Sequence, residues 1–174
     1  MNTHKLVFIG AAGVGKTTAI RAVSDDRPVD AGALLIPALG NISVVLDVGE
    51  LTLDDGDVLH LYGIAGDENF DALRPLLGEG VMGLVILIDS TRPDSLATLE
   101  RHLTWSAELI GAVPAIVALN RQDAAAATSP EDHVRHLAQC GLDLPVVAID
   151  PRERDDVLYL INMIVAMVAR GNMV

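Results

Sequence analysis

The chain has 174 residues, of which 51% are hydrophobic but only 3% are aromatic, and its formal net charge is −12. This length is typical of one domain, and a largely aliphatic core is typical of a parallel sheet covered by helices. The negative charge excludes a general affinity for nucleic acids or anionic membranes, and the single cysteine excludes an internal disulfide and a cysteine-rich metal cluster.

Strand-like apolar runs alternate with helix-like segments along the chain. We predict strands at 5–9, 42–48, 58–64, 83–88, 113–119 and 145–149. We predict helices at 16–24, 69–78, 94–110, 131–140 and 153–169. This order predicts a single α/β domain over 1–174, with a mostly parallel six-stranded sheet and helices on both faces. The Asp-Asp-Gly-Asp sequence at 54–57 indicates a hairpin, so one edge strand should be antiparallel.

The first predicted strand runs directly into Gly-Ala-Ala-Gly-Val-Gly-Lys-Thr at 10–17. This is the G-x-x-x-x-G-K-[ST] pattern of a phosphate-binding loop, and a strand before it and a helix after it are the context that it requires. Lys16 can reach the β- and γ-phosphates, and the Thr17 hydroxyl can bind Mg²⁺. The predicted phosphate site comprises Gly13, Val14, Gly15, Lys16, Thr17 and Thr18. The alternative is an ordinary glycine-rich turn.

We expect two segments near this loop to act as mobile gates over the phosphate site. The stretch 26–40 has no strong period and contains Pro28 and Pro37, so we expect a loop over the phosphate site. Gly66 and Asp67 follow the third predicted strand, where switch GTPases carry D-x-x-G-Q, and Gly63 stands in place of the aspartate. Gly66 would donate its N–H to a γ-phosphate, and Asp67 takes the place of the residue that orients the attacking water. The alternative is a simple loop.

A third motif, Asn120-Arg121-Gln122-Asp123, follows the fifth predicted strand and has the pattern N-[K/R]-x-D. A carboxylate accepts both the N1–H and the 2-amino group of guanine, and adenine lacks this donor pair, so Asp123 would select guanine. Asn120 can bridge the base region and the phosphate loop, and the stem of Arg121 can lie against the purine. Since Asn and Asp also populate turns, the pattern alone leaves a plain turn open.

Together these motifs resemble a bacterial small Ras-like P-loop GTPase, of the group found in conservon operons and related to gliding-motility GTPases. The resemblance is carried by 10–17, 44–49 (VVLDVG), 61–70 (LYGIAGDENF), 84–96 (LVILIDSTRPDSL) and 120–123. It implies that Ala148 and Ile149 lie in the last guanine-contacting loop. It further implies GTP/GDP and Mg²⁺ as cofactors, with Ser43 as a second metal ligand beside Thr17, and a dimeric roadblock-type protein as partner.

The same resemblance implies slow or partner-dependent GTP hydrolysis, since relatives carry glutamine where this chain has Asp67, an acceptor-only side chain when ionised. One alternative is a degenerate scaffold that binds GDP or no nucleotide. Another is a P-loop ATPase or kinase in which Asp89 organises Mg²⁺. Ligand comparison and Asp123→Ala would separate these classes.

Further expectations concern segments to which we assign no chemistry. The start of the chain has no signal-peptide pattern, and the apolar tract 157–169 is too short to cross a bilayer, so we expect a cytoplasmic protein. Asp150-Pro151-Arg152-Glu153 should cap the last helix. His133 and His136 should lie on a solvated helix face, and Cys140 should be a small buried residue.

Overall fold

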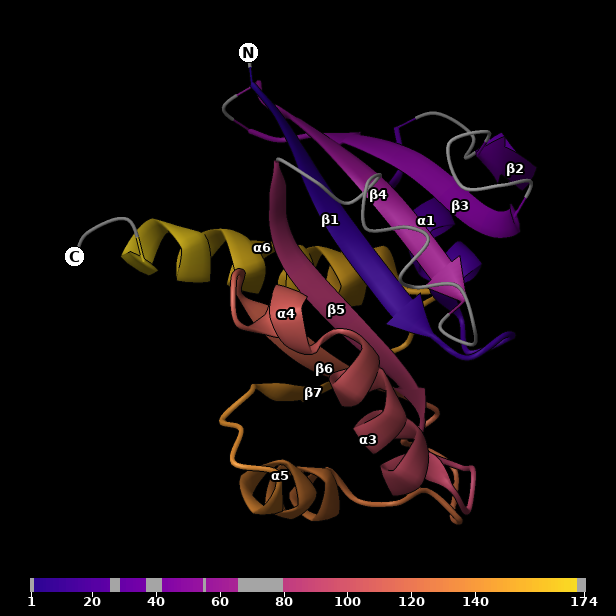
Figure 1. Ribbon diagram of the computed structural model, residues 1–174, viewed down its shortest axis with the longest axis vertical. Coiled ribbons are helices and arrows are strands. Elements are labelled where there is room, and N and C mark those ends of the chain that lie inside the picture. Colours follow the sequence, from indigo (N-terminus) through magenta and orange to yellow (C-terminus); the bar gives the residue numbers. More distant parts are fainter. Residues whose placement is uncertain (1, 26–28, 37–41, 55, 66–79, 172–174) are drawn as a thin grey trace.

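The computed structural model describes residues 2–25, 29–36, 42–54, 56–65 and 80–171, with side chains described outside 29–36 and 42–45. Seven strands form one sheet in the order β2-β3-β4-β1-β5-β6-β7 (Figure 1). The strands are β1 (Thr3–Gly10), β2 (Val29–Ile36), β3 (Ile42–Thr52), β4 (Val58–Ala65), β5 (Val81–Asp89), β6 (Ala115–Asn120) and β7 (Val146–Ala148). The helices are α1 (Lys16–Val23), α3 (Ser95–Trp105), α4 (Ala107–Ile110), α5 (Pro130–Gln139) and α6 (Arg154–Gly171).

The predicted fold class is confirmed, but the sheet gains a strand. Strand β2 lies in the segment that we expected to be a loop, and that expectation was wrong for 29–36. Its sequence, VDAGALLI, lacks the alternation that marks a strand, and antiparallel pairing with β3 holds it in the sheet. We predicted an antiparallel strand at the edge of the sheet. Strand β3 is antiparallel to both of its neighbours, but it is second from the edge, because β2 forms the edge strand.

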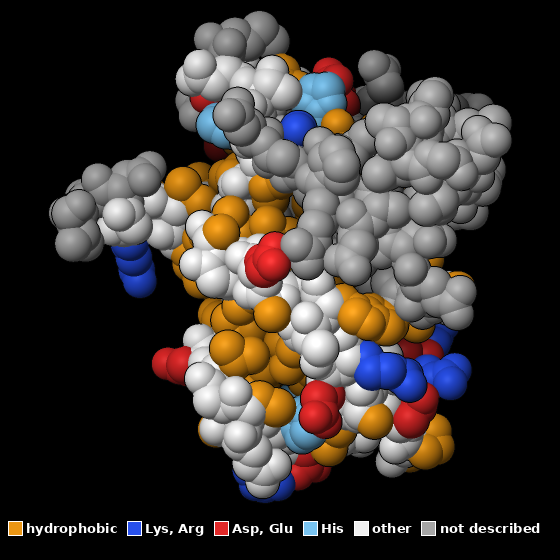
Figure 2. All heavy atoms as spheres, viewed as in Figure 1, with side chains coloured by type: hydrophobic (Ala, Val, Ile, Leu, Met, Phe, Trp, Pro, Cys, Tyr) orange, Lys and Arg blue, Asp and Glu red, His pale blue; other side chains and the backbone are white. Residues whose placement is uncertain are grey.

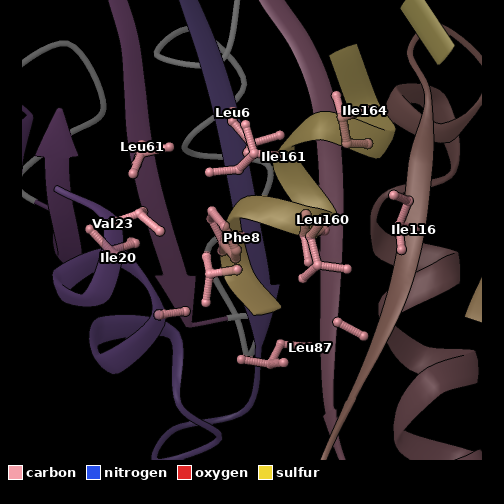
Figure 3. Close-up of a cluster of buried hydrophobic side chains, with 14 of the residues drawn as sticks. Leu6, Phe8, Ile20, Val23, Leu61, Leu87, Ile116, Leu160, Ile161 and Ile164 are labelled. Carbon is pink, nitrogen blue, oxygen red and sulfur yellow. The ribbon is translucent and has the colours of Figure 1, made fainter. Parts of the chain in front are cut away.

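Alternate residues of β1 face opposite sides of the sheet and belong to two hydrophobic clusters. Leu6 and Phe8 pack with α1 and α6, as Figure 3 shows, and Val7 and Ile9 face α3 and α5. Central strands buried on both faces read as continuous apolar runs in the sequence, which is why β1, β5 and β6 were predictable.

The predicted helix at 94–110 is divided at Ser106. The Ser106 hydroxyl donates to the carbonyl of His102 at 2.6 Å, and Ser106 itself leaves the helical conformation. Serine side chains that bond to their own helix in this way favour breaks and bends. The result is α3 followed by the short α4. The predicted helix at 69–78 lies outside the described residues.

Two side-chain expectations were wrong. His133 is fully buried on α5 instead of facing water, and its Nδ1 lies 2.8 Å from the carbonyl of Ser129. Cys140 is exposed, since it follows the last residue of α5. Within the described part of the chain, no helix is long and apolar enough to span a membrane, and no cluster of side chains could hold a metal ion by His, Cys, Asp and Glu alone.

The surface does not concentrate the negative charge in one continuous patch on the face shown in Figure 2. Asp and Glu side chains are separated there, and at the lower right they lie directly beside Lys and Arg side chains. Several of the described arginines form ion pairs with aspartates, including Arg92–Asp94, Arg135–Asp132 and Arg152–Asp150. Part of the negative charge on the described surface is therefore neutralised locally by arginines in ion pairs.

Candidate nucleotide-binding site

The phosphate loop connects the end of β1 to the start of α1. Gly13 and Gly15 have φ angles of 73° and 115°, in the left-handed region that side chains other than glycine rarely adopt. A Cβ on Gly15 would lie 3.0 Å from Cγ of Pro151 and 3.2 Å from Nδ2 of Asn120. Both the backbone conformation and the close neighbours therefore require glycine at this position.

The start of α1 is prepared for an anion. Its N-cap is Gly15, no side chain caps it, and its first turn carries no acidic residue. The unbonded N–H groups and the helix dipole at such an end favour a phosphate. Lys16 is buried, and its Nζ donates to the carbonyls of Gly10 at 2.8 Å and Ala11 at 2.9 Å, which holds the ammonium at the loop. Thr18 is exposed at the same helix end.

The Thr17 hydroxyl donates to Oδ2 of Asp47 on β3 at 2.6 Å. Asp47 pairs across the sheet with Gly63 of β4, and a Cβ on Gly63 would lie 3.0 Å from Cβ and 3.1 Å from Oδ2 of Asp47. The Asp47 side chain thus occupies the space that a side chain at 63 would need. A hydroxyl beside a carboxylate supplies the oxygen ligands that Mg²⁺ prefers, so the residues present fit this ion.

Asp47 is a site residue that sequence reasoning missed. The available signal was a carboxylate within the apolar run of VVLDVG, together with a glycine at 63 where a related GTPase carries aspartate. Of the other predicted residues on this side, Ser43 lies in β3 opposite Leu35, and its side chain is outside those described. Gly66 and Asp67 lie outside the described residues altogether.

The motif that we predict to bind the base begins where β6 ends. Nδ2 of Asn120 donates to the carbonyl of Val14 at 2.8 Å, and this bond joins the base loop to the phosphate loop across 106 positions of sequence. Arg121 has a φ of 62°, and its guanidinium forms an ion pair with Asp89 at the end of β5. The arrangement brings two of the predicted motifs into one site.

The hydrogen-bond partners of the Asp89 carboxylate lie on the base side of the candidate site. It accepts hydrogen bonds from the N–H and the hydroxyl of Thr91 at 3.1 and 2.6 Å, in addition to its pair with Arg121. Burial would raise the pKa of Asp89, but these hydrogen bonds and the charge of Arg121 outweigh it and keep the pKa below its ordinary value. The partner of Thr17 is Asp47, which weighs against the ATPase alternative built on Asp89.

A pocket of about 320 Å³ opens beside the base motif, within the size range of small-ligand sites. It is lined by Arg121, Gln122, Asp123, Ala148, Ile149, Asp150 and Asp156. The N–H of Ile149 donates to the carbonyl of Leu119 on β6 at 2.9 Å. The N–H of Asp150 donates to the carboxylate of Asp156 at 2.8 Å. Ile149 therefore lines the pocket with its amide already used, while Ala148 is exposed there.

Comparison with known proteins agrees with this geometry. The chain is similar to Ras-related protein Rab-18-B of Danio rerio, with 30% identity over 105 residues, which cover 59% of this chain and 48% of that protein. It is similar to the mutual gliding-motility protein MglA of Myxococcus xanthus, with 26% identity over 140 residues, which cover 74% of this chain and 72% of that protein. The match thus spans about half of the Rab protein's length and most of MglA. The family model described as "Ras family" matches residues 5–142, and the chain belongs to that family.

Proposed function

We propose that this Ras-family chain is a guanine-nucleotide-binding switch with slow intrinsic GTP hydrolysis. The observation that carries the proposal is the bond from Asn120 to Val14, because it brings the candidate base pocket and the phosphate loop to one continuous site. Asp123 lines the pocket and is exposed, and within the described residues no hydrogen bond to its carboxylate is found. It is therefore available to the N1–H and 2-amino group of guanine.

On the phosphate side, Lys16 and the N–H groups at the start of α1 would bind the β- and γ-phosphates. Thr17 and Asp47 would hold Mg²⁺, which when bound neutralises phosphate charge. The Thr17 hydroxyl gives its hydrogen to Asp47, so its oxygen keeps lone pairs for the ion. Asp47 would then supply the carboxylate near Mg²⁺ that the aspartate replaced by Gly63 supplies in related GTPases. Ser43 is the proposed second ligand from β3.

Slow hydrolysis follows from the chemistry of Asp67. An ionised carboxylate accepts hydrogen bonds but cannot donate one, and it adds negative charge where charge already accumulates. We propose that a partner, of the roadblock type found in conservon-like systems, supplies or completes the hydrolytic machinery in the cytoplasm. The segments 26–43 and 64–80 would report the nucleotide state to that partner.

Isothermal titration of purified protein with GDP, GTP, a non-hydrolysable GTP analogue and ATP tests the proposal. We expect binding of the guanine nucleotides in preference to ATP, and Asp123→Ala should remove that preference. Asp143→Ala, which removes an exposed carboxylate between α5 and β7, is the matched control and should retain it. Equal affinity for all three guanine ligands with no structural difference would favour the scaffold, and a preference for ATP would favour the ATPase.

Hydrolysis is tested separately, by single-turnover release of phosphate from bound GTP. The wild-type chain should release phosphate slowly, and Asp67→Gln should release it faster because glutamine both donates to and accepts from the attacking water. Rapid turnover by the wild-type chain alone would contradict the proposed slow switch.

A further inference from the structure

The turn that follows β7 belongs to the nucleotide site. Pro151 is buried against the phosphate loop, so that a Cβ on Gly15 would meet its ring at 3.0 Å. Asp150, the residue before it, lines the candidate base pocket. We expected this turn to cap the last helix, but α6 begins only at Arg154, and the Asp150 side chain is used elsewhere. The turn is thus held beside both the phosphate and the base regions.

Three of the residues that line the pocket are aspartates, which presents a problem for guanine. They are Asp123, Asp150 and Asp156. Guanine offers hydrogen-bond donors only at N1 and the 2-amino group, whereas its O6 and N7 are acceptors. One carboxylate can meet the donor pair. A second uncompensated carboxylate facing O6 or N7 would repel the base.

Two of the three carboxylates have partners within the protein. Asp156 accepts the N–H of Asp150 at 2.8 Å. Both oxygens of Asp150 accept from Arg152, whose Nε lies 2.9 and 3.1 Å from them and whose Nη2 lies 2.5 Å from Oδ2, and the Arg152 N–H adds a bond at 2.9 Å. Such a planar, two-pronged contact is among the strongest that an arginine makes with a carboxylate.

We propose that Arg152 sets the base specificity of the pocket by neutralising Asp150, which leaves Asp123 as the lining carboxylate without a hydrogen-bond partner among the described residues. The inference rests on the proposed guanine site. A base that gives N1–H and its 2-amino group to Asp123 would turn O6, which adjoins N1, toward the other lining residues, among them Ala148, Ile149 and Asp150. Without Arg152 this group of residues carries a bare negative charge, which disfavours O6 of guanine and favours the 6-amino group of adenine.

The pKa values agree with this charge arrangement. Side-chain and backbone hydrogen bonds from Arg152 lower the pKa of Asp150 to about 2. The bonds to Asp150, and after them the charges of Asp150 and Asp123, raise the pKa of Arg152. The guanidinium therefore lies within the electrostatic reach of both the carboxylate that it neutralises and the one that would read the base.

The test compares Arg152→Ala, Asp150→Asn and the double variant by titration with GDP and ADP. Arg152→Ala should bind GDP about tenfold more weakly, as expected for one uncompensated charge a few ångströms from an acceptor in a partly solvated site. Its preference for GDP over ADP should fall as well. The double variant should recover to within about twofold of wild type, because it removes the charge that Arg152 neutralised.

Two further measurements separate a charge effect from a packing effect. The defect of Arg152→Ala should shrink as salt rises from about 0.1 M to 1 M, since the screening length falls from about 10 Å to 3 Å. Arg135→Ala is the matched control: Arg135 also pairs with an aspartate, Asp132, at 2.6 Å, but on α5 away from the pocket. It should bind GDP as the wild type does.

The inference is overturned if Arg152→Ala binds GDP and ADP like the wild type. It is also overturned if the double variant stays as weak as Arg152→Ala, because Arg152 would then act through a direct contact or through the fold. If the wild-type chain binds no guanine nucleotide, the proposed function fails, and that failure is seen before any variant is compared.

Discussion

The phosphate half and the base half of the candidate site are built in different ways. The phosphate half holds the ammonium of Lys16 buried against backbone carbonyls, and its shape depends on glycines with left-handed φ angles. The base half holds its cations, Arg121 and Arg152, at the surface, each against an aspartate. A buried group bound by the backbone is costly to replace, whereas an exposed ion pair is weak and salt-sensitive. Changes to the first half should therefore abolish binding, and changes to the second should adjust it.

The largest effect should come from Lys16→Ala. It removes the only cation of the phosphate half within the described residues, and hydrogen bonds to charged groups are worth about 1.5–3 kcal/mol each, so GDP and GTP affinity should fall by about 100-fold or more. Titration calorimetry measures the loss, with thermal unfolding to show that the variant folds. Retention of GDP affinity within tenfold would remove the distinction between the halves.

Asp47→Asn should have the next largest effect, and only when magnesium is present. Asparagine keeps the size of the side chain and its acceptor oxygen but loses the negative charge beside Thr17. Nucleotide affinity in Mg²⁺ should fall by about tenfold, and affinity in excess chelator should not change. Asp54→Asn, at the exposed hairpin after β3, is the matched control. An equal loss with and without Mg²⁺ would show that Asp47 supports the loop and not the ion.

Arg121→Ala tests the base half, where a smaller effect is expected. The guanidinium is half exposed, and pairs of this kind contribute about 0.2–1 kcal/mol, which corresponds to no more than about fivefold in affinity. The loss should decrease in high salt, unlike that of Lys16→Ala. Titration of both variants at two salt concentrations makes the comparison, and a salt-independent, hundredfold loss at Arg121 would contradict it.

The smallest effect should be that of mild acid on the free energy of unfolding, and we expect it to come from His133 on α5, near the base half. Burial lowers the pKa of His133 below its ordinary value, so between that value and the lowered one the unfolded chain binds more protons than the folded chain. The free energy of unfolding should therefore fall as pH drops below about 6.5. The thermal midpoint of the wild type should drop by about 2–4 °C per kcal/mol lost.

His133→Gln should reduce that dependence on pH, because glutamine does not titrate. The matched control is His60→Gln, which replaces a partly exposed histidine of β4, 3.9 Å from Glu50 and far along the sheet order from β7, on which α5 packs. His133 is connected to the base half by two hydrogen bonds. The carbonyl of Ser129 accepts one from His133, and the carbonyl of the preceding residue, Thr128, accepts one from the side chain of Gln122. The same pH dependence in wild type and His133→Gln would rule out this histidine as the cause.

Local sequence was enough to locate the parts of the candidate site that lie in continuous segments. The phosphate loop and the base motif each occupy a few consecutive residues at a strand end. The strands before them, β1 and β6, are continuously apolar over 6–9 and 115–119, where both of their faces are buried. Their meeting in one site was also foreseeable, since the carboxyl ends of parallel strands lie at one edge of the sheet.

Only the tertiary structure decided the features that join distant residues. Strand β2 exists through its pairing with β3, and Asp47 reaches Thr17 because the β3–β4 register sets it opposite Gly63. The sequence suggested helix capping for the turn at 150–153. In the structure Pro151 lies close to Gly15, Asp150 lines the candidate base pocket, and Arg152 is bonded to Asp150. Propensity and motif act over a few neighbouring residues, whereas register and packing bring together side chains that no short window of sequence contains.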